Sequence, residues 1–498
     1  MTEIEKNRTE PGGGRISPEL DTLLAALVGE QRHRIYQQIG LAYPHTIRFN
    51  PLKGDIQAQA ALLAEEGFRF EAHPTLPNVF RIQFQPFPIG KSLSHFLGYI
   101  YVQDLSSMIP PLVLDPRPGE RVLDLSAAPG SKTTQMAGLM ANRGVIVAND
   151  VAMKRLRGLI TNLERMGVVN TAVYKWYGEQ YGNAYFEQFD RVLLDPACSG
   201  LGTLHKNPEV LGWWTPAHCD RLSRSQRSLL ISAVKAVRPG GVVVYSTCTL
   251  TPQENEAVVS HVLENYPVEL EAISLPGLET HPGLTEFEGQ AFHPQLNRAI
   301  RIYPFENESE GFFVARLRKT EAMPPPVRKT GRRPPEHLAF LNARTAPAKK
   351  YLEYLCRHFG IPEKALAPYR FVVGKNLSVV SRELAEFPFQ ARPLQMGLMM
   401  AHLLKQAAKL TTGGAHLLGP QATRQVVELP DPAALQAFVN RQPMNLPVEG
   451  KRQVLVRYKG CLIGYGIVEQ GQLKSQFPKA EWPFHLVQED PPEIPNEP

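Results

Sequence analysis

Two strongly apolar segments, each ending in a cysteine, are the feature that most constrains the fold of this chain. Residues 189–200 read Phe-Asp-Arg-Val-Leu-Leu-Asp-Pro-Ala-Cys-Ser-Gly, and residues 241–250 read Gly-Val-Val-Val-Tyr-Ser-Thr-Cys-Thr-Leu. Such runs are typical of strands that are covered on both faces of a parallel sheet. Ligands of open α/β sheets bind outside the carboxyl ends of the strands, so Cys198 and Cys248 should face one crevice. The alternative is that each cysteine only fills space in the core, which is its common use.

A loop that joins a short strand to a helix adds a second feature to the same edge of the sheet. Residues 121–134 run from Arg-Val-Leu-Asp-Leu through Ser-Ala-Ala-Pro-Gly-Ser-Lys into a helical segment. Small residues let the backbone approach a ligand closely, and the start of a helix offers unpaired N–H groups. The loop has neither the P-loop spacing nor the three glycines of the dinucleotide fingerprint. Asp150 ends the next strand at about the spacing from which an acid reaches ribose hydroxyls, although an aspartate there is also often a helix cap.

These segments together resemble the signature set of the RNA cytosine carbon-5 methyltransferases of the Sun/nucleolar-protein type. The main matching motifs are Ser126-Ala-Ala-Pro-Gly-Ser-Lys132, Asp195-Pro-Ala-Cys-Ser-Gly200 and Ser246-Thr-Cys-Thr-Leu250. The pattern is also fitted by Lys206-Asn-Pro-Glu209, Arg238-Pro-Gly-Gly241, Glu254-Asn-Glu-Ala257, Glu310-Gly-Phe-Phe-Val-Ala315, and Arg48 with Asn50. The resemblance covers about residues 20–320. The order of parts, with a C-terminal extension, is most similar to the bacterial branch that modifies 16S ribosomal RNA.

The resemblance implies S-adenosylmethionine as the methyl donor, cytosine in RNA as the acceptor, and no metal. Carbon-5 of cytosine becomes nucleophilic once a thiolate has added at carbon-6. By resemblance, Cys248 is this nucleophile and Cys198 assists release of the product, while Asp195 hydrogen-bonds the cytosine edge and Lys132 lies close by. Arg48 and Asn50 are expected to contact RNA. The expected cofactor contacts are Ser126, Ala127, Ala128, Pro129, Gly130, Ser131, Lys132, Asp150 and Asp195.

The chain departs from the family pattern at two positions. Ala197 stands directly before Cys198, where most members have proline. Tyr177 stands where the family usually carries an aspartate that contacts the adenine ring. Stacking by Trp176 or Tyr177, or a contact from Glu179, are the alternatives for replacing that aspartate, and the sequence does not choose between them.

Composition is that of an ordinary globular protein, with 43% hydrophobic and 20% charged residues among 498 and a net charge of +6. This mild charge permits a nucleic-acid partner without predicting one. Five cysteines without a Cys-x-x-Cys pair indicate a reducing cytoplasm and give no metal signature. No apolar run reaches the roughly 18 residues that a membrane span needs. A cytoplasmic monomer is therefore expected.

Strand and helix alternate over 106–320, which indicates a parallel sheet with helices on both faces. The expected fold is α/β: a Rossmann-like methyltransferase sheet, an N-terminal α+β RNA-binding subdomain and a C-terminal small β-barrel (PUA-like) domain. Thr251-Pro-Gln-Glu254 reads as a capping box, so a helix should begin just after Cys248.

The expected segments are a disordered leader (1–17), the RNA-binding subdomain (18–105), the catalytic domain (106–320), a basic Pro-rich linker (321–345), a connecting helical or mixed segment (346–410), the PUA-like RNA-binding domain (411–487) and a disordered tail (488–498).

The sequence has three alternatives to an enzyme that acts on ribosomal RNA or the small ribosomal subunit. A tRNA substrate stays open, because the catalytic motifs are shared. A DNA cytosine methyltransferase is disfavoured, because it would use a nucleophile at the position of Cys198 and would not need Cys248. A catalytically inactive RNA-binding scaffold has only the Tyr177 departure in its favour.

Overall fold

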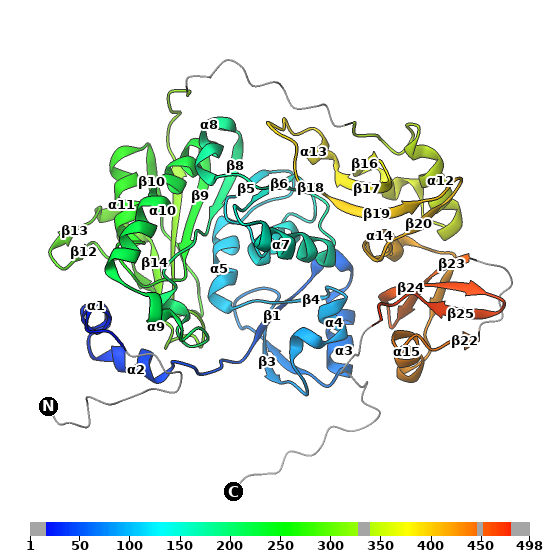
Figure 1. The fold of residues 1–498 in the computed structure, drawn as a ribbon, viewed down its shortest axis with the longest axis horizontal. Coiled ribbons are helices and arrows are strands. Elements are labelled where there is room, and N and C mark those ends of the chain that lie inside the picture. The colour runs from blue at the N-terminus through cyan, green and yellow to red at the C-terminus, as the bar shows by residue number, and fades with distance from the viewer. Residues whose placement is uncertain (1–15, 327–338, 446–451, 480–498) are drawn as a thin grey trace, which may run out of the picture.

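The computed structural model describes residues 16–326, 339–445 and 452–479, and within them a ten-stranded sheet forms the centre of the molecule (Figure 1). The strand order is β11-β14-β15-β9-β8-β5-β6-β7-β18, and β10 pairs with β15. The strands are β5 (Arg121–Asp124), β6 (Val145–Asn149), β7 (Thr171–Tyr174), β8 (Phe189–Leu194), β9 (Val237–Thr247), β10 (Val268–Glu271), β11 (His281–Pro282), β14 (Ile300–Ile302), β15 (Phe312–Lys319) and β18 (Gln395–Met396). The five strands from β9 to β7 run parallel, and β15 is antiparallel to β9.

Helices cover both faces of this sheet, as the alternation of strand and helix predicts. Alternate residues of one strand enter different cores: Leu123 packs with one cluster and Val122 with the other. The first cluster takes side chains from α8, α10 and α11, and the second takes them from α5, α6 and α7. The helix bounds are α5 (Leu105–Leu114), α6 (Ser131–Leu139), α7 (Met153–Met166), α8 (Tyr181–Ala184), α9 (Val210–Trp213), α10 (Pro216–Ala236) and α11 (Glu256–Asn265). The predicted α/β fold with a Rossmann-like sheet is confirmed.

An antiparallel sheet of order β2-β3-β1-β4 precedes the central sheet. Its strands are β1 (Thr46–Phe49), β2 (Arg69–Ala72), β3 (Val79–Phe84) and β4 (Ile100–Val102), accompanied by α3 (Ile56–Glu65) and α4 (Leu93–Phe96). The first helices, α1 (Pro18–Val28) and α2 (Arg32–Gln37), pack instead against Leu201, Trp214 and Tyr303 of the catalytic part. The N-terminal helices are therefore integrated with the catalytic part rather than with the antiparallel sheet.

Two further sheets follow, with strand orders β16-β17-β19-β20 and β21-β23-β24-β25-β22. The first consists of β16 (Tyr369–Val373), β17 (Asn376–Ser381), β19 (Leu398–Leu403) and β20 (Ala408–Leu410), with helices α12 (Ala348–Phe359), α13 (Arg382–Ala385) and α14 (Thr412–Leu418). The second consists of β21 (Val426–Glu428), β22 (Met444–Asn445), β23 (Arg452–Tyr458), β24 (Cys461–Glu469) and β25 (Gln472–Ser475), with α15 (Pro432–Val439). The segment 346–410 thus contains a sheet of its own. Nothing in these two sheets identifies the PUA-like domain that the sequence predicts.

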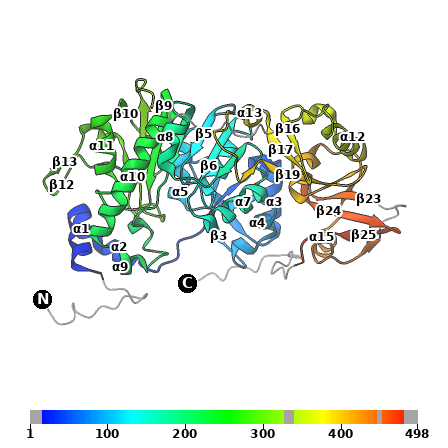
Figure 2. The same ribbon diagram turned by 45° about the horizontal axis from the view of Figure 1, so that its top comes forward.

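The C-terminal sheets are joined to the rest of the chain by apolar contacts. Figures 1 and 2 show α3 and α4 beside β24, and Leu62 and Tyr99 share a core with Val456 and Ile463. Strand β18 extends the central sheet by pairing with β7. Within the described residues, no helix has the length and apolar character that crossing a membrane requires. The leader up to residue 15, the linker residues 327–338 and the tail 488–498 lie outside the described residues.

Candidate functional site

The two cysteines meet just beyond the carboxyl ends of the neighbouring parallel strands β8 and β9. Cys198 Sγ and Cys248 Sγ are 3.2 Å apart, and both cysteines are free. The loops that carry them are fastened to each other, because Gly202 N donates to the Cys248 carbonyl oxygen at 2.9 Å. Ser199 N donates to a Glu254 carboxylate oxygen at 3.0 Å. The structure therefore brings the two thiols together at the carboxyl ends of these strands.

The surroundings of Cys198 disfavour its ionised form. The hydrogen bond to Cys248 raises the pKa of Cys198 well above its usual range, and burial and the charges of Cys248, Glu254 and Asp195 act in the same direction. Cys198 is therefore a neutral thiol near pH 7. The thiolate is the nucleophilic form of cysteine, so the raised pKa disfavours Cys198 as the nucleophile.

A partly buried ion pair adjoins the thiols. Lys132 Nζ donates to Asp195 Oδ2 at 2.7 Å, and Ser246 Oγ donates to Asp195 Oδ1 at 2.8 Å. Burial acts to lower the pKa of Lys132, but the Asp195 carboxylate outweighs it, and the net result is a raised pKa. Lys132 Nζ also donates to Ser107 Oγ at 3.1 Å. Ser107 lies in α5, in a segment where no motif marks it in the sequence.

The loop between β5 and α6 lies at the same edge of the sheet. Gly130 precedes α6 with φ +104°, a conformation that residues with a side chain rarely adopt. Thr133 Oγ1 donates to Asp124 Oδ2 at 2.7 Å, and burial raises the pKa of Asp124 to about 7. The residues between them, Ser126–Lys132, form the predicted cofactor loop. The buried carboxyl group of Asp124 is a feature that the structure adds.

Asp150 lies at the end of β6, and one of its carboxylate oxygens, Oδ2, has no hydrogen-bond partner among the described residues. The residue is 3% exposed, and its Oδ1 accepts from Ala152 N at 2.9 Å. Its Oδ2 is buried without a hydrogen-bond partner, although the half-exposed Arg155 guanidinium lies 3.2 Å away. A buried carboxylate oxygen that accepts no protein hydrogen bond among the described residues can accept one from a ribose hydroxyl. Together with the N–H groups at the start of α6, it makes these residues suited to hold S-adenosylmethionine.

The aromatic residues after β7 differ in their exposure. Trp176 packs against the rings of Tyr174 and Tyr181, with ring centroids 5.4 Å away in each case. Tyr177 is 69% exposed, and Glu179 is also exposed. Of the three residues considered as replacements for the family's aspartate, the structure commits Trp176 to core packing.

Arg48 and Asn50 do not lie where an RNA contact would place them. Arg48 is 5% exposed and donates to Gln103 Oε1 at 2.9 Å and to Thr134 Oγ1 at 2.7 Å, at the start of α6. Asn50 is 1% exposed and donates to the carbonyl oxygens of Gly98 and Met166. Both side chains are engaged inside the protein, so in place of the expected RNA contact we assign them a structural role between the N-terminal sheet and the catalytic part.

The predicted helix after Cys248 exists, but the predicted start of that helix is wrong. Residues 252–255 form turns, and α11 begins at Glu256. The reason is that the Glu254 side chain is buried and does not cap a helix. Its carboxylate accepts from Ser199 N and, at 2.8 Å, from Gln226 Nε2.

Comparison with known proteins identifies relatives across most of the chain. The family described as 16S rRNA methyltransferase RsmB/F matches residues 111–318. Ribosomal RNA small subunit methyltransferase F of Vibrio atlanticus is 34% identical over 439 residues, covering 87% of this chain and 90% of the relative. The tRNA (cytosine(49)-C(5))-methyltransferase of Pyrococcus abyssi is 44% identical over 275 residues, covering 55% of this chain and 88% of the relative.

Two solved structures from Pyrococcus horikoshii are similar in fold to about three fifths of this chain. A methyltransferase homolog protein has a TM-score of 0.55 and 38% identity, covering 60% of this chain and 93% of its own. NSun6 in complex with SFG has a TM-score of 0.55 and 25% identity, covering 61% of this chain and 98% of its own. SFG is an analogue of S-adenosylmethionine.

Proposed function

Because this chain belongs to the RsmB/F family of 16S rRNA methyltransferases, we propose that it methylates carbon-5 of a cytosine in 16S ribosomal RNA through a covalent bond to Cys248. It is an S-adenosylmethionine-dependent RNA methyltransferase. The observation that carries the covalent mechanism is the 3.2 Å contact between Cys198 and Cys248 beside the Lys132–Asp195 pair. We expect the enzyme to act as a monomer in the cytoplasm, where ribosomal RNA is found.

The proton between the two sulfurs sets the order of the steps. With that proton on Cys198, Cys248 attacks carbon-6 of cytosine, and electron density moves to carbon-5. Asp195 holds the edge of the base, and Lys132 keeps the Asp195 carboxylate in place. S-adenosylmethionine, held by Ser126–Lys132 and Asp150, supplies an electrophilic methyl group when bound.

Release of the product depends on the bond that the Cys248 sulfur has formed with carbon-6. Once its sulfur is bonded to carbon-6, the sulfur carries no negative charge and no longer accepts the Cys198 proton. The two effects of Cys248 that raise the pKa of Cys198 are then gone. Cys198 then releases its proton to solvent more readily, and the resulting thiolate takes the proton from carbon-5. After this the double bond re-forms and the bond from Cys248 to carbon-6 breaks.

The choice of ribosomal RNA rests on how far the relatives extend along the chain. The similarity to ribosomal RNA small subunit methyltransferase F covers 87% of this chain and so reaches into the C-terminal sheets. The similarity to the tRNA enzyme covers 55%. That enzyme's higher identity of 44% keeps tRNA as the second candidate substrate.

Bisulfite sequencing of total RNA tests this choice. Cells that lack the gene should lose 5-methylcytosine at one or more positions of 16S ribosomal RNA. The wild-type gene should restore the methylation, and Cys248→Ala should not. Loss of methylation in tRNA alone would establish the second candidate, and no loss in either RNA would contradict the proposed function.

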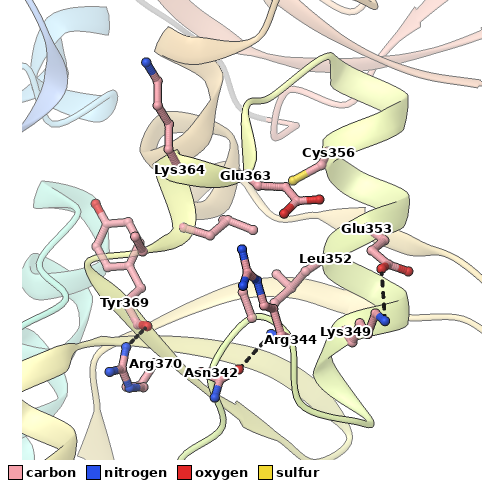
Figure 3. A pocket seen from close by; sticks show the side chains of 13 residues that line it. Asn342, Arg344, Lys349, Leu352, Glu353, Cys356, Glu363, Lys364, Tyr369 and Arg370 are labelled. Atoms are coloured by element: carbon pink, nitrogen blue, oxygen red, sulfur yellow. Dashed lines mark hydrogen bonds and ion pairs between the residues drawn. The ribbon is translucent and has the colours of Figure 1, made fainter.

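The C-terminal sheets are proposed to raise the affinity for RNA. A cavity of about 450 Å³ lies between α12 and β16, and Figure 3 shows the Arg344 side chain rising into it. Lys364 and Arg370 also line this cavity. Lys349 lies 3.6 Å from Glu353, which offsets its charge. Cationic side chains around a concave surface suit an RNA phosphate.

The contribution of the C-terminal sheets to RNA affinity is tested better by substituting residues than by removing the sheets. Val380, Leu384 and Phe387 belong to the core of the catalytic sheet, so removing the C-terminal part would expose that core. Arg344→Gln with Arg370→Gln should weaken RNA binding and reduce the slope of log affinity against log salt by about 1 to 2.

The same substitution at the exposed Lys405 is the matched control. An unchanged affinity and salt slope in the double variant would remove the α12–β16 cavity from the RNA-binding surface.

A further inference from the structure

A second cavity, of about 570 Å³, lies between the N-terminal part and the loop that follows Cys198. Pockets of roughly 300–1,000 Å³ are usual for small ligands, so this one has room for a nucleotide. Its walls come from residues 40–46, from the junction of β4 with α5, and from residues 205–208. The side chains that the argument uses are Tyr43, Asp104, His205 and Lys206.

The cavity adjoins the catalytic residues. Lys206 forms an ion pair with Glu310, and Glu310 N is 3.3 Å from the Asp104 carboxylate oxygens to which it donates. Asp104 in turn caps α5, the helix in which Ser107 accepts from Lys132. Burial lowers the pKa of Lys206, but Glu310, Asp104 and the Cys248 sulfur together raise it. The wall of the cavity is therefore connected to Lys132 through Glu310, Asp104 and helix α5.

His205 forms part of the wall of this cavity. The residue is 6% exposed, and its Nδ1 is buried without a hydrogen-bond partner among the described residues. Its ring packs on the Tyr43 ring, with the centroids 4.3 Å apart and the planes 30° from parallel. Burial, aided by the charge of Lys206, lowers the pKa of His205 to about 4. The imidazole is therefore neutral at pH 7 and offers a hydrogen bond rather than a charge.

A neutral hydrogen-bonding group beside an aromatic ring suits a nucleobase better than a phosphate. Proteins that read single-stranded RNA stack bases on aromatic side chains and hydrogen-bond their edges. Lys206 at the rim has the charge that a phosphate of the same strand would need. A target cytosine held near Cys248 would bring its neighbour in the strand to this cavity.

We propose that the cavity binds a nucleotide next to the target cytosine, and that His205 Nδ1 hydrogen-bonds the edge of its base. His205 is then a specificity-determining residue, and the Tyr43 ring supports it. This inference rests on the proposed function, because it requires an RNA cytosine at Cys248.

The test measures which neighbouring bases the enzyme accepts. Transcripts of the small-subunit RNA region that carries the methylated cytosine are made with each of the four bases on either side of it. Wild-type enzyme should prefer one base at one of these positions. His205→Phe keeps the ring and removes Nδ1, so the ratio of kcat/KM between the preferred base and the others should fall about tenfold. Its affinity for S-adenosylmethionine should stay unchanged.

His402→Phe makes the same chemical change on the exposed part of β19 and should keep the wild-type preference. Should His205→Phe fail to fold, Tyr43→Leu removes the supporting ring and should lower the same ratio.

A preference that survives in folded His205→Phe, or a wild-type enzyme indifferent to both neighbours, would overturn the inference. A wild-type enzyme that methylates none of the transcripts would instead overturn the proposed function on which it rests.

Discussion

Replacing Asp150 by asparagine should weaken S-adenosylmethionine binding while leaving the fold intact. The two oxygens of Asp150 are used differently: Oδ1 accepts from Ala152 N at 2.9 Å, and the buried Oδ2 has no hydrogen-bond partner. Asparagine keeps an oxygen for Ala152 N and loses the negative charge toward the ribose. The change therefore separates a role in the local turn from a role in cofactor binding.

The expected size of the effect follows from the burial of the site. Asp150 is 3% exposed, so solvent screens a hydrogen bond to it weakly. A hydrogen bond to a charged group contributes about 1.5–3 kcal/mol, which corresponds to a roughly 10- to 150-fold change in the dissociation constant. The local backbone hydrogen bond survives, so the free energy of unfolding should change by less than about 1 kcal/mol.

Calorimetric titration with S-adenosylmethionine and thermal melting of the unliganded protein measure the two quantities separately. Asp190→Asn is the matched control, because Asp190 lies at the amino end of β8, at the opposite edge of the sheet. An Asp150→Asn protein that binds S-adenosylmethionine as tightly as wild type would refute the cofactor role. Lost stability with unchanged affinity would show that Asp150 only holds the turn.

Two further predictions concern buried charges. Glu256→Gln leaves the Arg301 guanidinium unpaired in the core, where the two side chains are 0% and 1% exposed, so the free energy of unfolding in urea should fall by about 3–5 kcal/mol. Glu271→Gln, in a pair whose side chains are 28% and 20% exposed, should cost less than about 1 kcal/mol, and equal losses would contradict this reasoning. Burial raises the pKa of Asp124 from 3.8 to about 7, so the folded protein binds this proton more tightly than the unfolded chain does, and stability should fall as pH rises between those values. Asp124→Asn should lack that part of the pH dependence of the melting temperature, and parallel curves for both proteins would show that Asp124 does not titrate in this range.

The features that the sequence predicted best are those that depend only on local pattern and on the packing of neighbouring strands. Cys198 and Cys248 each follow an apolar strand, and parallel packing alone brings the carboxyl ends of such strands together. Helix α7 (Met153–Met166) is a similar case, because it ends at Gly167, whose φ of 75° suits glycine, so a local sequence signal coincides with the end of the helix. In these cases the local pattern and the fold favour the same structure.

The wrong expectations all depend on contacts from distant residues. Arg48 is expected to contact RNA, but its guanidinium donates to Thr134, which lies far along the chain. Glu254 matched a capping box, but Ser199 and Gln226 take its carboxylate. Strand β18 has only two residues, and its pairing with β7 leaves no periodicity to detect in the sequence. Burial and partner choice at such positions are set by tertiary packing.

The division of labour between the two thiols is the central claim, and a denaturing gel tests it most directly. Each cysteine variant is incubated with substrate RNA, with and without S-adenosylmethionine. Cys198→Ala should methylate once and then remain attached to RNA through Cys248, giving a slow, protease-sensitive band that requires S-adenosylmethionine. Cys248→Ala should give neither the band nor methylation. A trapped complex in Cys248→Ala and none in Cys198→Ala would contradict the account and reverse the two roles.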